Sequence, residues 1–243
     1  MKHRPSKIKQ PPFTQTPTEP MLKLRFGEKD KNKEAGIDEA GRGSLWGPLY
    51  AAAVIWQPTD QESITPLIKD SKKLSAKRRT ALAESIKKHA LDWGIGSVTP
   101  QEIDTIGMTK ANQLAFTRAL DKLTVKPERL LIDGCLSIYQ PPWSMVEQVV
   151  EVEADNSYVA VAAASILAKV GHDEWIERFC TQHEELTERY DLLKNKGYGT
   201  AKHIEGIRKW GEHSEHRKLF LRKFHASHQE TNEHDSLLET TST

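Results

Sequence analysis

Acidic residues stand at the ends of apolar segments in this sequence. Asp38 and Glu39 follow the segment AGI, Asp133 closes the segment LLID, and Asp155 shortly precedes a long helical pattern. Strand ends of this kind meet at one edge of an open sheet, so we expect these carboxylates to lie together. Clustered carboxylates repel one another, and a hard divalent cation such as Mg²⁺ or Mn²⁺ relieves the repulsion because it prefers oxygen ligands. Two such ions can activate a water molecule for phosphodiester hydrolysis.

Each of these acids also has a purely structural interpretation. A glycine follows Asp133, which is an ordinary turn signal, and Asp155 could cap the helix that follows it. The pair Asp38-Glu39 is harder to explain in this way, because neighbours on a strand point to opposite faces. Both can serve one site only where the strand ends or bends.

The tripeptide Gly41-Arg42-Gly43 supplies such a bend. Glycines let the backbone approach a phosphate or a sugar closely, and successive N–H groups form a nest for an anion. Arg42 could add a bidentate phosphate contact. The alternative is a tight turn with a solvated arginine.

Two further segments suggest contacts with nucleic acid. DSKKLS places Lys72 and Lys73 directly before a helix, where a lysine could hold a backbone phosphate or simply be solvated. NKGYGT sets Tyr198 between glycines, where its ring could stack on a sugar or a base. The alternative for Tyr198 is a ring that covers the edge of the core.

The spacing of apolar residues predicts the elements that position these groups. Strands are expected over residues 35–38, 49–57, 93–98, 129–133 and 145–152, and helices over 74–90, 99–107, 110–123 and 157–186. Ser75 is a candidate N-cap, and Thr99 with Glu102 forms a capping box. This order predicts an α/β fold with a mixed sheet flanked by helices.

Composition excludes several classes of protein. The 243 residues have a formal net charge of +1, and no apolar run approaches the ~18 residues that a membrane helix needs. The basic start of the chain lacks the apolar core of a secretory signal. Cys135 and Cys180 form no CxxC pair, so a reducing, cytoplasmic location is expected. No feature predicts an oligomer, and a monomer is the default expectation.

Charge is uneven along the chain. Residues 1–33 carry nine Lys or Arg against three Asp or Glu, and residues 225–243 carry four acids and no Lys or Arg. Both ends are polar and have little to bury, so we expect a flexible basic arm over 1–33 and a disordered tail over 225–243. One folded domain is expected over 34–224, with a helical C-terminal segment from about residue 185.

Five motifs, in order, match a known family. They are GIDEAGRGSLWGPLYAAAVI, DSKKLS, LIDG, AAASILAKV and NKGYGT, and the match spans residues 35 to about 224. The sequence resembles the type 2 ribonucleases H, most closely the bacterial ribonuclease HII family. The resemblance implies a ribonuclease H-like fold and an endonuclease that cleaves the RNA strand of RNA–DNA hybrids. It also implies nicking 5′ to single ribonucleotides embedded in duplex DNA, with 5′-phosphate and 3′-hydroxyl products.

The resemblance implies roles for nine residues of this chain. The family's four catalytic acids, which bind two Mg²⁺ or Mn²⁺ ions, match Asp38, Glu39, Asp133 and Asp155. The family's loop that reads the 2′-hydroxyl and the adjacent phosphate matches Gly41, Arg42 and Gly43. A phosphate-binding lysine matches Lys72, and the tyrosine that stacks on the sugar beyond the ribonucleotide matches Tyr198.

The sequence departs from the family pattern in two places. Ser44 and Trp46 stand where proline and a small residue are more common, and Trp46 is expected to reshape the surface near the loop. Residues 211–220 lack the usual Pro-Ser pair but retain His216, Arg217 and Phe220.

Two other functions fit parts of the pattern. A metal-dependent DNA nuclease or resolvase would keep the fold and the acids but would cut plain DNA. The 2′-hydroxyl loop and Tyr198 argue against it. A non-catalytic hybrid-binding protein would use the acids only as caps and turns, and the intact set of four acids argues against that.

Overall fold

The structure, a computed structural model, describes residues 21–27, 31–57 and 64–222. Residues 1–20 and 28–30 of the predicted arm, and all of the predicted tail, lie outside this part of the chain. The described elements follow in the order β1 (Glu34–Ala40), β2 (Leu49–Ile55), η1 (Thr65–Leu67), η2 (Ser71–Lys73), α1 (Ala76–His89), β3 (Asp92–Val98), α2 (Pro100–Ile106), α3 (Met108–Leu120), β4 (Arg129–Asp133), η3 (Trp143–Met145), β5 (Glu147–Glu151), η4 (Ala154–Asn156), α4 (Val159–Gln182), α5 (Glu184–Tyr190), α6 (Leu192–Asn195) and α7 (Ala201–Trp210).

The strands form one mixed sheet in the order β3-β2-β1-β4-β5. β1 pairs antiparallel with β2, and β2 pairs antiparallel with β3. On its other side β1 pairs parallel with β4, which pairs parallel with β5. All five predicted strands are therefore present, and the predicted mixed sheet is confirmed. Because β1, β4 and β5 are parallel, their carboxyl ends lie at the same edge.

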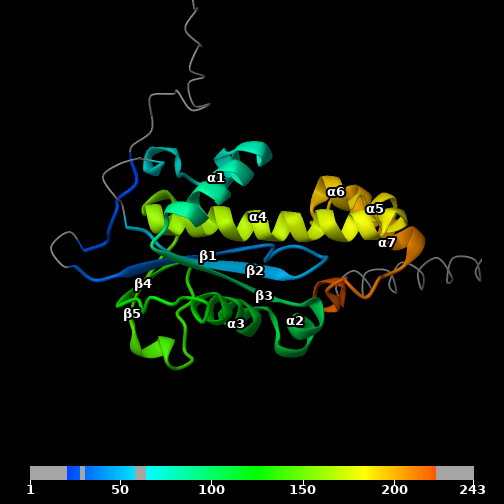
Figure 1. Ribbon diagram of the computed structural model, residues 1–243. Coiled ribbons are helices and arrows are strands. Elements are labelled where there is room, and N and C mark those ends of the chain that lie inside the picture. The colour runs from blue at the N-terminus through cyan, green and yellow to red at the C-terminus, as the bar shows by residue number, and fades with distance from the viewer. Residues whose placement is uncertain (1–20, 28–30, 58–63, 223–243) are drawn as a thin grey trace, which may run out of the picture.

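Helices cover both faces of the sheet (Figure 1). The long helix α4 lies across β1 and β2 with α1 beside it, and α2 and α3 lie on the opposite face. The first half of α4 is rich in alanine, which allows close packing against the sheet. At Gly36 in β1, a Cβ would overlap the backbone of Ala160 and Val161, so only glycine permits this approach.

Two local features of the sequence predict helix starts correctly. The side chain of Ser75 accepts a hydrogen bond from the N–H of Arg78 at the start of α1. Thr99 and Glu102 form the predicted capping box at the start of α2. These contacts satisfy backbone N–H groups that have no partner inside the helix.

Most predicted boundaries differ from the structure by a few residues, and two of the differences have a clear cause. β1 continues to Ala40 instead of ending at Asp38, because Asp38, Glu39 and Ala40 keep pairing with β2. The long helix ends at Gln182 instead of residue 186, because His183 adopts a non-helical backbone with φ −138° and ψ 66°. The chain then resumes as the short helices α5, α6 and α7, which form the expected helical C-terminal segment.

The C-terminal helices enclose a second apolar cluster built around Trp46. Its indole is fully buried, makes an edge contact with His216 at a centroid distance of 4.5 Å, and stacks on His213 at 5.0 Å. The expectation that Trp46 reshapes the surface is therefore wrong. The ring instead joins the loop after β1 to the C-terminal segment.

Residues 21–27, which fall within the predicted arm, contact the folded core. The N–H of Lys23 donates to the carbonyl of Ser157, and the N–H of Val159 donates to the carbonyl of Lys23. The carboxylate of Glu34 accepts from the N–H of Phe26 and pairs with buried Arg129 at 2.7 Å. This segment therefore packs where the chain enters α4.

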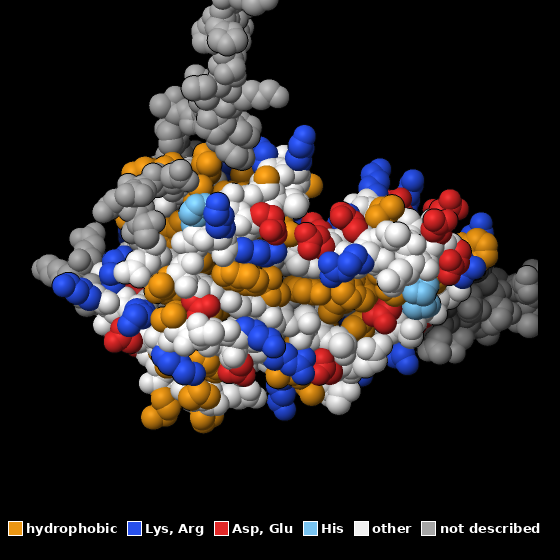
Figure 2. Space-filling model, in the orientation of Figure 1, with side chains coloured by type: hydrophobic (Ala, Val, Ile, Leu, Met, Phe, Trp, Pro, Cys, Tyr) orange, Lys and Arg blue, Asp and Glu red, His pale blue; other side chains and the backbone are white. Residues whose placement is uncertain are grey.

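The surface carries mixed charge. Figure 2 shows Lys and Arg interspersed with Asp and Glu on the visible face, with hydrophobic side chains in a band across its middle. Cys135 is exposed and Cys180 is buried, and both are free thiols. In the part of the chain that the structure describes, no helix is long and apolar enough to cross a membrane.

Candidate active site

The register of two parallel strands brings Asp38 and Asp133 together. Ile37 of β1 pairs with Ile132 of β4, so Asp38 and Asp133 are the next residues along each strand. Only 6% of Asp38 is exposed, and Asp133 is half-buried at the end of β4. The carboxyl edge of the sheet therefore holds two adjacent carboxylates, as predicted.

Asp38 and Glu39 approach this edge from opposite faces of the sheet. The side chain of Asp38 meets Ser165 of α4, and the side chain of Glu39 meets Asn112 of α3. The backbone N–H of Glu39 donates to Asp38 Oδ1 at 2.7 Å. Both carboxylates are nevertheless close enough to Asp133 to be repelled by its charge. The bend at Gly41 follows the pair and is not what lets both acids face one site.

Asp133 connects β4 to the short helix η4. Its Oδ1 accepts a hydrogen bond of 2.8 Å from the N–H of Ala154, which places Asp155 next to it. Asp155 is only 3% exposed and does not cap α4, because the N-cap residue of that helix is Tyr158. The alternative interpretation of Asp155 as a helix cap is therefore wrong.

Burial raises the pKa values of all four carboxylates, and repulsion from neighbouring acids adds to the effect at Asp38, Glu39 and Asp155. Burial raises the pKa of Asp38 well above its usual range, and the charges of Glu39 and Asp133 add to this effect. Burial and the charge of Asp133 raise the pKa of Asp155 to about 6. The pKa values of Glu39 and Asp133 are also raised, mainly by burial. Such a cluster strongly favours a bound cation.

Lys72 supplies one positive charge beside this cluster. Burial alone would lower its pKa, but the carboxylates of Asp155, Asp70, Asp38 and Asp133 outweigh that effect and raise it. Asp70, which the sequence did not single out, accepts the N–H of Lys72 at 2.9 Å and so holds the lysine backbone in place.

The tripeptide Gly41-Arg42-Gly43 forms a tight turn next to the acids. The carbonyl of Gly41 accepts the N–H of Ser44 at 3.2 Å, so Arg42 and Gly43 occupy the centre of the turn. Gly41 has a φ of +81°, which favours glycine, and a Cβ there would overlap the ring of His172. The guanidinium of Arg42 is 3.6 Å from Glu39 Oε1 and thus links the turn to the acids.

Tyr198 lies against this turn. Its backbone forms a β-bridge with Ser44, and its hydroxyl lies beside the N–H of Gly41. Its side chain is partly exposed, and Lys169 Nζ is 5.5 Å from the ring centroid. The structure therefore places Tyr198 next to the turn, with part of its ring accessible.

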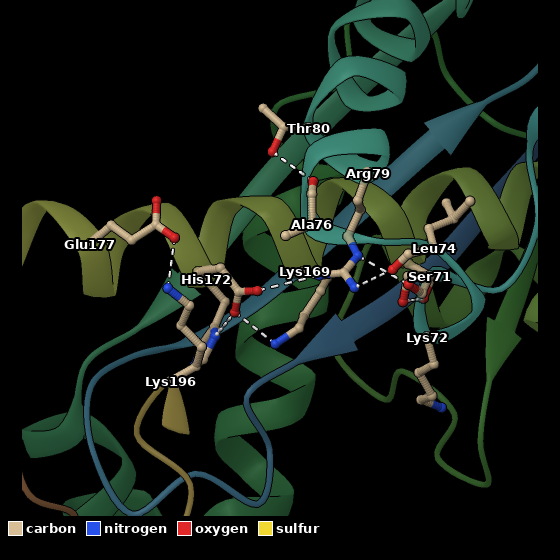
Figure 3. A network of polar contacts seen from close by, with 12 residues as sticks. Ser71, Lys72, Leu74, Ala76, Arg79, Thr80, Lys169, His172, Glu177 and Lys196 are labelled. Atoms are coloured by element: carbon tan, nitrogen blue, oxygen red, sulfur yellow. Dashed lines mark hydrogen bonds and ion pairs between the residues drawn. The ribbon is translucent and has the colours of Figure 1, made fainter. Parts of the chain in front are cut away.

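A polar network links α4 to α1 and to residues 71–74 (Figure 3). Asp173 Oδ1 accepts from Lys169 at 2.7 Å and from His172 Nδ1 at 3.1 Å, and Asp173 Oδ2 is 3.4 Å from Arg79 Nη1. Arg79 also donates to the carbonyls of Ser71 and Leu74, beside Lys72. Asp173 therefore joins α4 to the Lys72 segment, and burial lowers the pKa of His172.

The four carboxylates suit a hard cation, although their side chains do not converge on one point in this structure. Among residues 21–27, 31–57 and 64–222, no three Asp, Glu, His or Cys side chains are arranged to hold one metal ion together. The observation in favour of a metal is chemical. Four mutually coupled carboxylates, with raised pKa values, supply the oxygen ligands that Mg²⁺ and Mn²⁺ prefer.

Comparison with known proteins identifies the family. A family model described as Ribonuclease HII matches residues 35–227 of the chain. The chain belongs to the ribonuclease HII family. The ribonuclease HII of Bacteroides thetaiotaomicron is 46% identical over 187 residues, which cover 77% of this chain and 88% of that protein. The ribonuclease HII of Caldanaerobacter subterraneus is 42% identical over 205 residues, covering 82% and 80%.

Solved structures agree with this assignment. Ribonuclease H2 from Pyrococcus horikoshii OT3 is 28% identical with a TM-score of 0.59, covering 77% of this chain and 93% of that one. The ribonuclease HII from Archaeoglobus fulgidus, solved in a complex with PCNA, is 30% identical with a TM-score of 0.62, covering 76% and 93%. As a member of the ribonuclease HII family, the chain is a hydrolase with the ribonuclease H fold.

Proposed function

We propose that this ribonuclease HII family member is an endonuclease that hydrolyses the RNA strand of RNA–DNA hybrids and nicks 5′ to single ribonucleotides in duplex DNA. One observation carries the proposal. The Gly41–Gly43 turn contacts both the acids and the tyrosine, because Arg42 is 3.6 Å from Glu39 Oε1 and the hydroxyl of Tyr198 lies beside the N–H of Gly41. A hydrolytic centre, a backbone that can approach a sugar closely and a stacking ring are thus adjacent.

We infer that four acids would hold two divalent ions, Mg²⁺ or Mn²⁺. They are Asp38, Glu39, Asp133 and Asp155, and their carboxylates would turn toward common points as the ions bind. When bound, the ions supply activation of water and stabilisation of the leaving oxygen. Binding deprotonates carboxylates whose pKa values are raised, so metal affinity should fall as the pH is lowered.

The other residues of the site would bind and orient the nucleic acid. Lys72, which is close enough to Asp155 to feel its charge, would contact a backbone phosphate. The N–H groups of Arg42 and Gly43 donate no hydrogen bond within the described residues, so they are available to a 2′-hydroxyl and a phosphate. Tyr198 would stack on the sugar that follows the ribonucleotide. Cleavage 5′ to the ribonucleotide would leave 5′-phosphate and 3′-hydroxyl ends.

The test uses a labelled DNA duplex that contains one ribonucleotide, beside an all-DNA duplex and an RNA–DNA hybrid. Wild-type protein and Asp133→Asn are incubated with Mg²⁺, Mn²⁺ or EDTA. We expect cleavage only at ribonucleotides, only with metal, and not by Asp133→Asn. Equal cutting of plain DNA would favour a DNA nuclease. Metal-independent binding without cleavage would favour a hybrid-binding protein.

A further inference from the structure

A buried arginine from the C-terminal segment contacts the backbone of the Gly41–Gly43 turn. Arg217 is fully buried. Its Nη1 donates to the carbonyl of Gly41 at 2.6 Å and to the carbonyl of Arg42 at 3.2 Å, and its Nε donates to the carbonyl of Gly47 at 2.8 Å. One rigid side chain therefore holds three carbonyls of the loop between β1 and β2.

The carboxylate of Asp104 acts on this cation only through its charge and forms no ion pair with it. Within the described residues Arg217 has no ion-pair partner, and its Nη2 makes no hydrogen bond. Burial lowers the pKa of the guanidinium to about 10, so it still carries its charge at neutral pH. A buried charge paired only with carbonyls is costly, and an apolar side chain of similar size would fill the space at lower cost. The contacts with the turn explain why a cation occupies this position.

The backbone on both sides of Arg217 is fixed to the same loop. The N–H of Arg217 donates to the carbonyl of Leu45 at 2.8 Å, and the N–H of Gly47 donates to the carbonyl of Glu215 at 2.9 Å. Trp46 and His216 form a β-bridge between these two hydrogen bonds. The guanidinium is therefore positioned by the backbone as well as by its own contacts.

Peptide geometry turns these carbonyl contacts into an orientation of N–H groups. In a trans peptide the C=O and the following N–H point in opposite directions. The carbonyls of Gly41 and Arg42 point toward the buried guanidinium, so the N–H groups of Arg42 and Gly43 point away from it. A cation on the carbonyl side also polarises the two peptides and strengthens these N–H groups as donors.

We propose that Arg217 is the positioning residue of the Gly41–Gly43 turn, presenting the Arg42 and Gly43 N–H groups to the ribonucleotide. The inference rests on the proposed function for the identity of the ligand. It assigns a role in specificity to a side chain that touches no substrate and lies 176 residues from Gly41 in the sequence.

The test compares Arg217→Met with Arg217→Lys. Methionine keeps the approximate length and removes all three hydrogen bonds, whereas lysine keeps the charge but not the planar fork. The control is Arg118→Met, because Arg118 of α3 also donates to a backbone carbonyl, that of Ser97, and forms its ion pair with Glu102 of α2 instead of contacting the turn. Circular dichroism and thermal unfolding verify that each variant folds. If Arg217→Met does not fold, the same measurements are made on Arg217→Lys alone.

Two measurements are made in an Asp133→Asn background, which prevents cleavage. The first is the Kd for an all-DNA duplex divided by the Kd for the same duplex with one ribonucleotide. The second is amide hydrogen exchange of Ser44, whose N–H closes the turn. We expect Arg217→Met to lower the Kd ratio at least about tenfold and to accelerate Ser44 exchange. Arg217→Lys should recover part of both effects, and Arg118→Met should change neither.

The outcomes separate this inference from the proposed function. If the background protein prefers the ribonucleotide duplex and Arg217→Met leaves that preference unchanged, the positioning role is wrong and the function stands. A lost preference with unchanged Ser44 exchange also overturns the inference, because the effect then does not pass through the turn. If no ribonucleotide preference exists at all, the proposed function fails. Ser44 exchange then decides alone whether Arg217 holds the turn.

Discussion

Asp38 and Asp133 lie side by side at the ends of the parallel strands β1 and β4, one residue beyond the pair Ile37–Ile132. Their charges repel each other in a place that is largely buried, and the pKa values of both carboxyls are raised. Without a cation this arrangement opposes folding. Sites of this kind are maintained for function at the expense of stability.

The first prediction concerns Asp38→Asn. The amide can still accept the N–H of Glu39, so the fold should be retained. Removing the buried charge should raise the melting temperature of the metal-free protein by a few degrees. Cleavage should fall by about 10²–10³-fold, which corresponds to several kcal/mol of lost transition-state stabilisation. Thermal unfolding in EDTA and single-turnover cleavage in Mg²⁺ measure the two effects.

Glu84→Gln is the matched control for this prediction. Glu84 lies on α1 and forms an exposed ion pair with Lys87, so the substitution should leave both measurements close to the wild type. An Asp38→Asn protein that cleaves as fast as the wild type would remove Asp38 from the catalytic set.

The second prediction concerns the pH dependence of stability through Asp155. Its folded-state pKa of about 6 lies above the ordinary value of 3.8, so the folded chain binds more protons than the unfolded chain between these values. Protonation of Asp155 therefore raises the free energy of unfolding of the metal-free protein as the pH falls from about 6 to 4. The increase is roughly 1 kcal/mol per pH unit at most. Asp155→Asn should be more stable than the wild type at pH 7, and the difference should shrink toward pH 4.

Urea unfolding at pH 4, 5, 6 and 7 in EDTA measures this difference. Saturating Mg²⁺ should reverse its sign at pH 7, because the wild type then gains binding free energy that the variant has partly lost. An Asp155→Asn protein that is less stable than the wild type in EDTA at pH 7 would mean that Asp155 is a structural residue.

The main elements of the site could be predicted from sequence because each signal is local. Asp38 and Asp133 both follow short apolar runs, and the parallel pairing of β1 and β4 brings such positions to one edge. Thr99 and Glu102 indicate the start of a helix within a segment of four residues. In each case the residue type and its immediate neighbours determine the structure.

Other features depend on contacts that local sequence does not contain. Arg217 binds backbone carbonyls 170 to 176 residues away, and a carbonyl has the same chemistry in every residue. β1 extends past Asp38 only because β2 continues to pair with it. Trp46 is buried because two histidines and one tyrosine from the C-terminal segment pack against it. Tertiary packing decides all three.

The third prediction concerns Tyr198. If its ring stacks on the sugar that follows the ribonucleotide, Tyr198→Phe should keep most of the activity and Tyr198→Ala should lose it. Stacking contributes about 1–3 kcal/mol, so kcat/KM for a single-ribonucleotide duplex should fall roughly 10–100-fold in the alanine variant. Tyr139→Ala is the control, since Tyr139 is an exposed tyrosine. Equal losses for phenylalanine and alanine would assign the effect to the hydroxyl beside Gly41 instead.

The backbone of Tyr198 is held by a chain of two neutral histidines. The N–H of His213 donates to His216 Nδ1 at 2.9 Å, so the proton of His216 is on Nε2, which faces His203 Nε2 at 3.1 Å. His203 Nδ1 then donates to the carbonyl of Tyr198 at 3.0 Å. This order of hydrogen-bond donors and acceptors is possible only when both imidazole rings are uncharged.

The fourth prediction follows from the cost of charging these rings. Burial, together with the neighbouring His203, lowers the pKa of His216 from 6.5 to about 3, so between these values the unfolded chain binds a proton that the folded chain does not. The free energy of unfolding should therefore fall as the pH drops below about 6.5, by up to ~1.4 kcal/mol per pH unit. Because Asp155 acts with the opposite sign, Asp155→Asn should be compared with Asp155→Asn/His216→Phe. Phenylalanine keeps an aromatic ring against Trp46 but cannot titrate, so the double variant should be less stable at pH 7 and lose less stability between pH 7 and 5. Parallel pH profiles in urea unfolding would show that His216 does not carry this acid sensitivity.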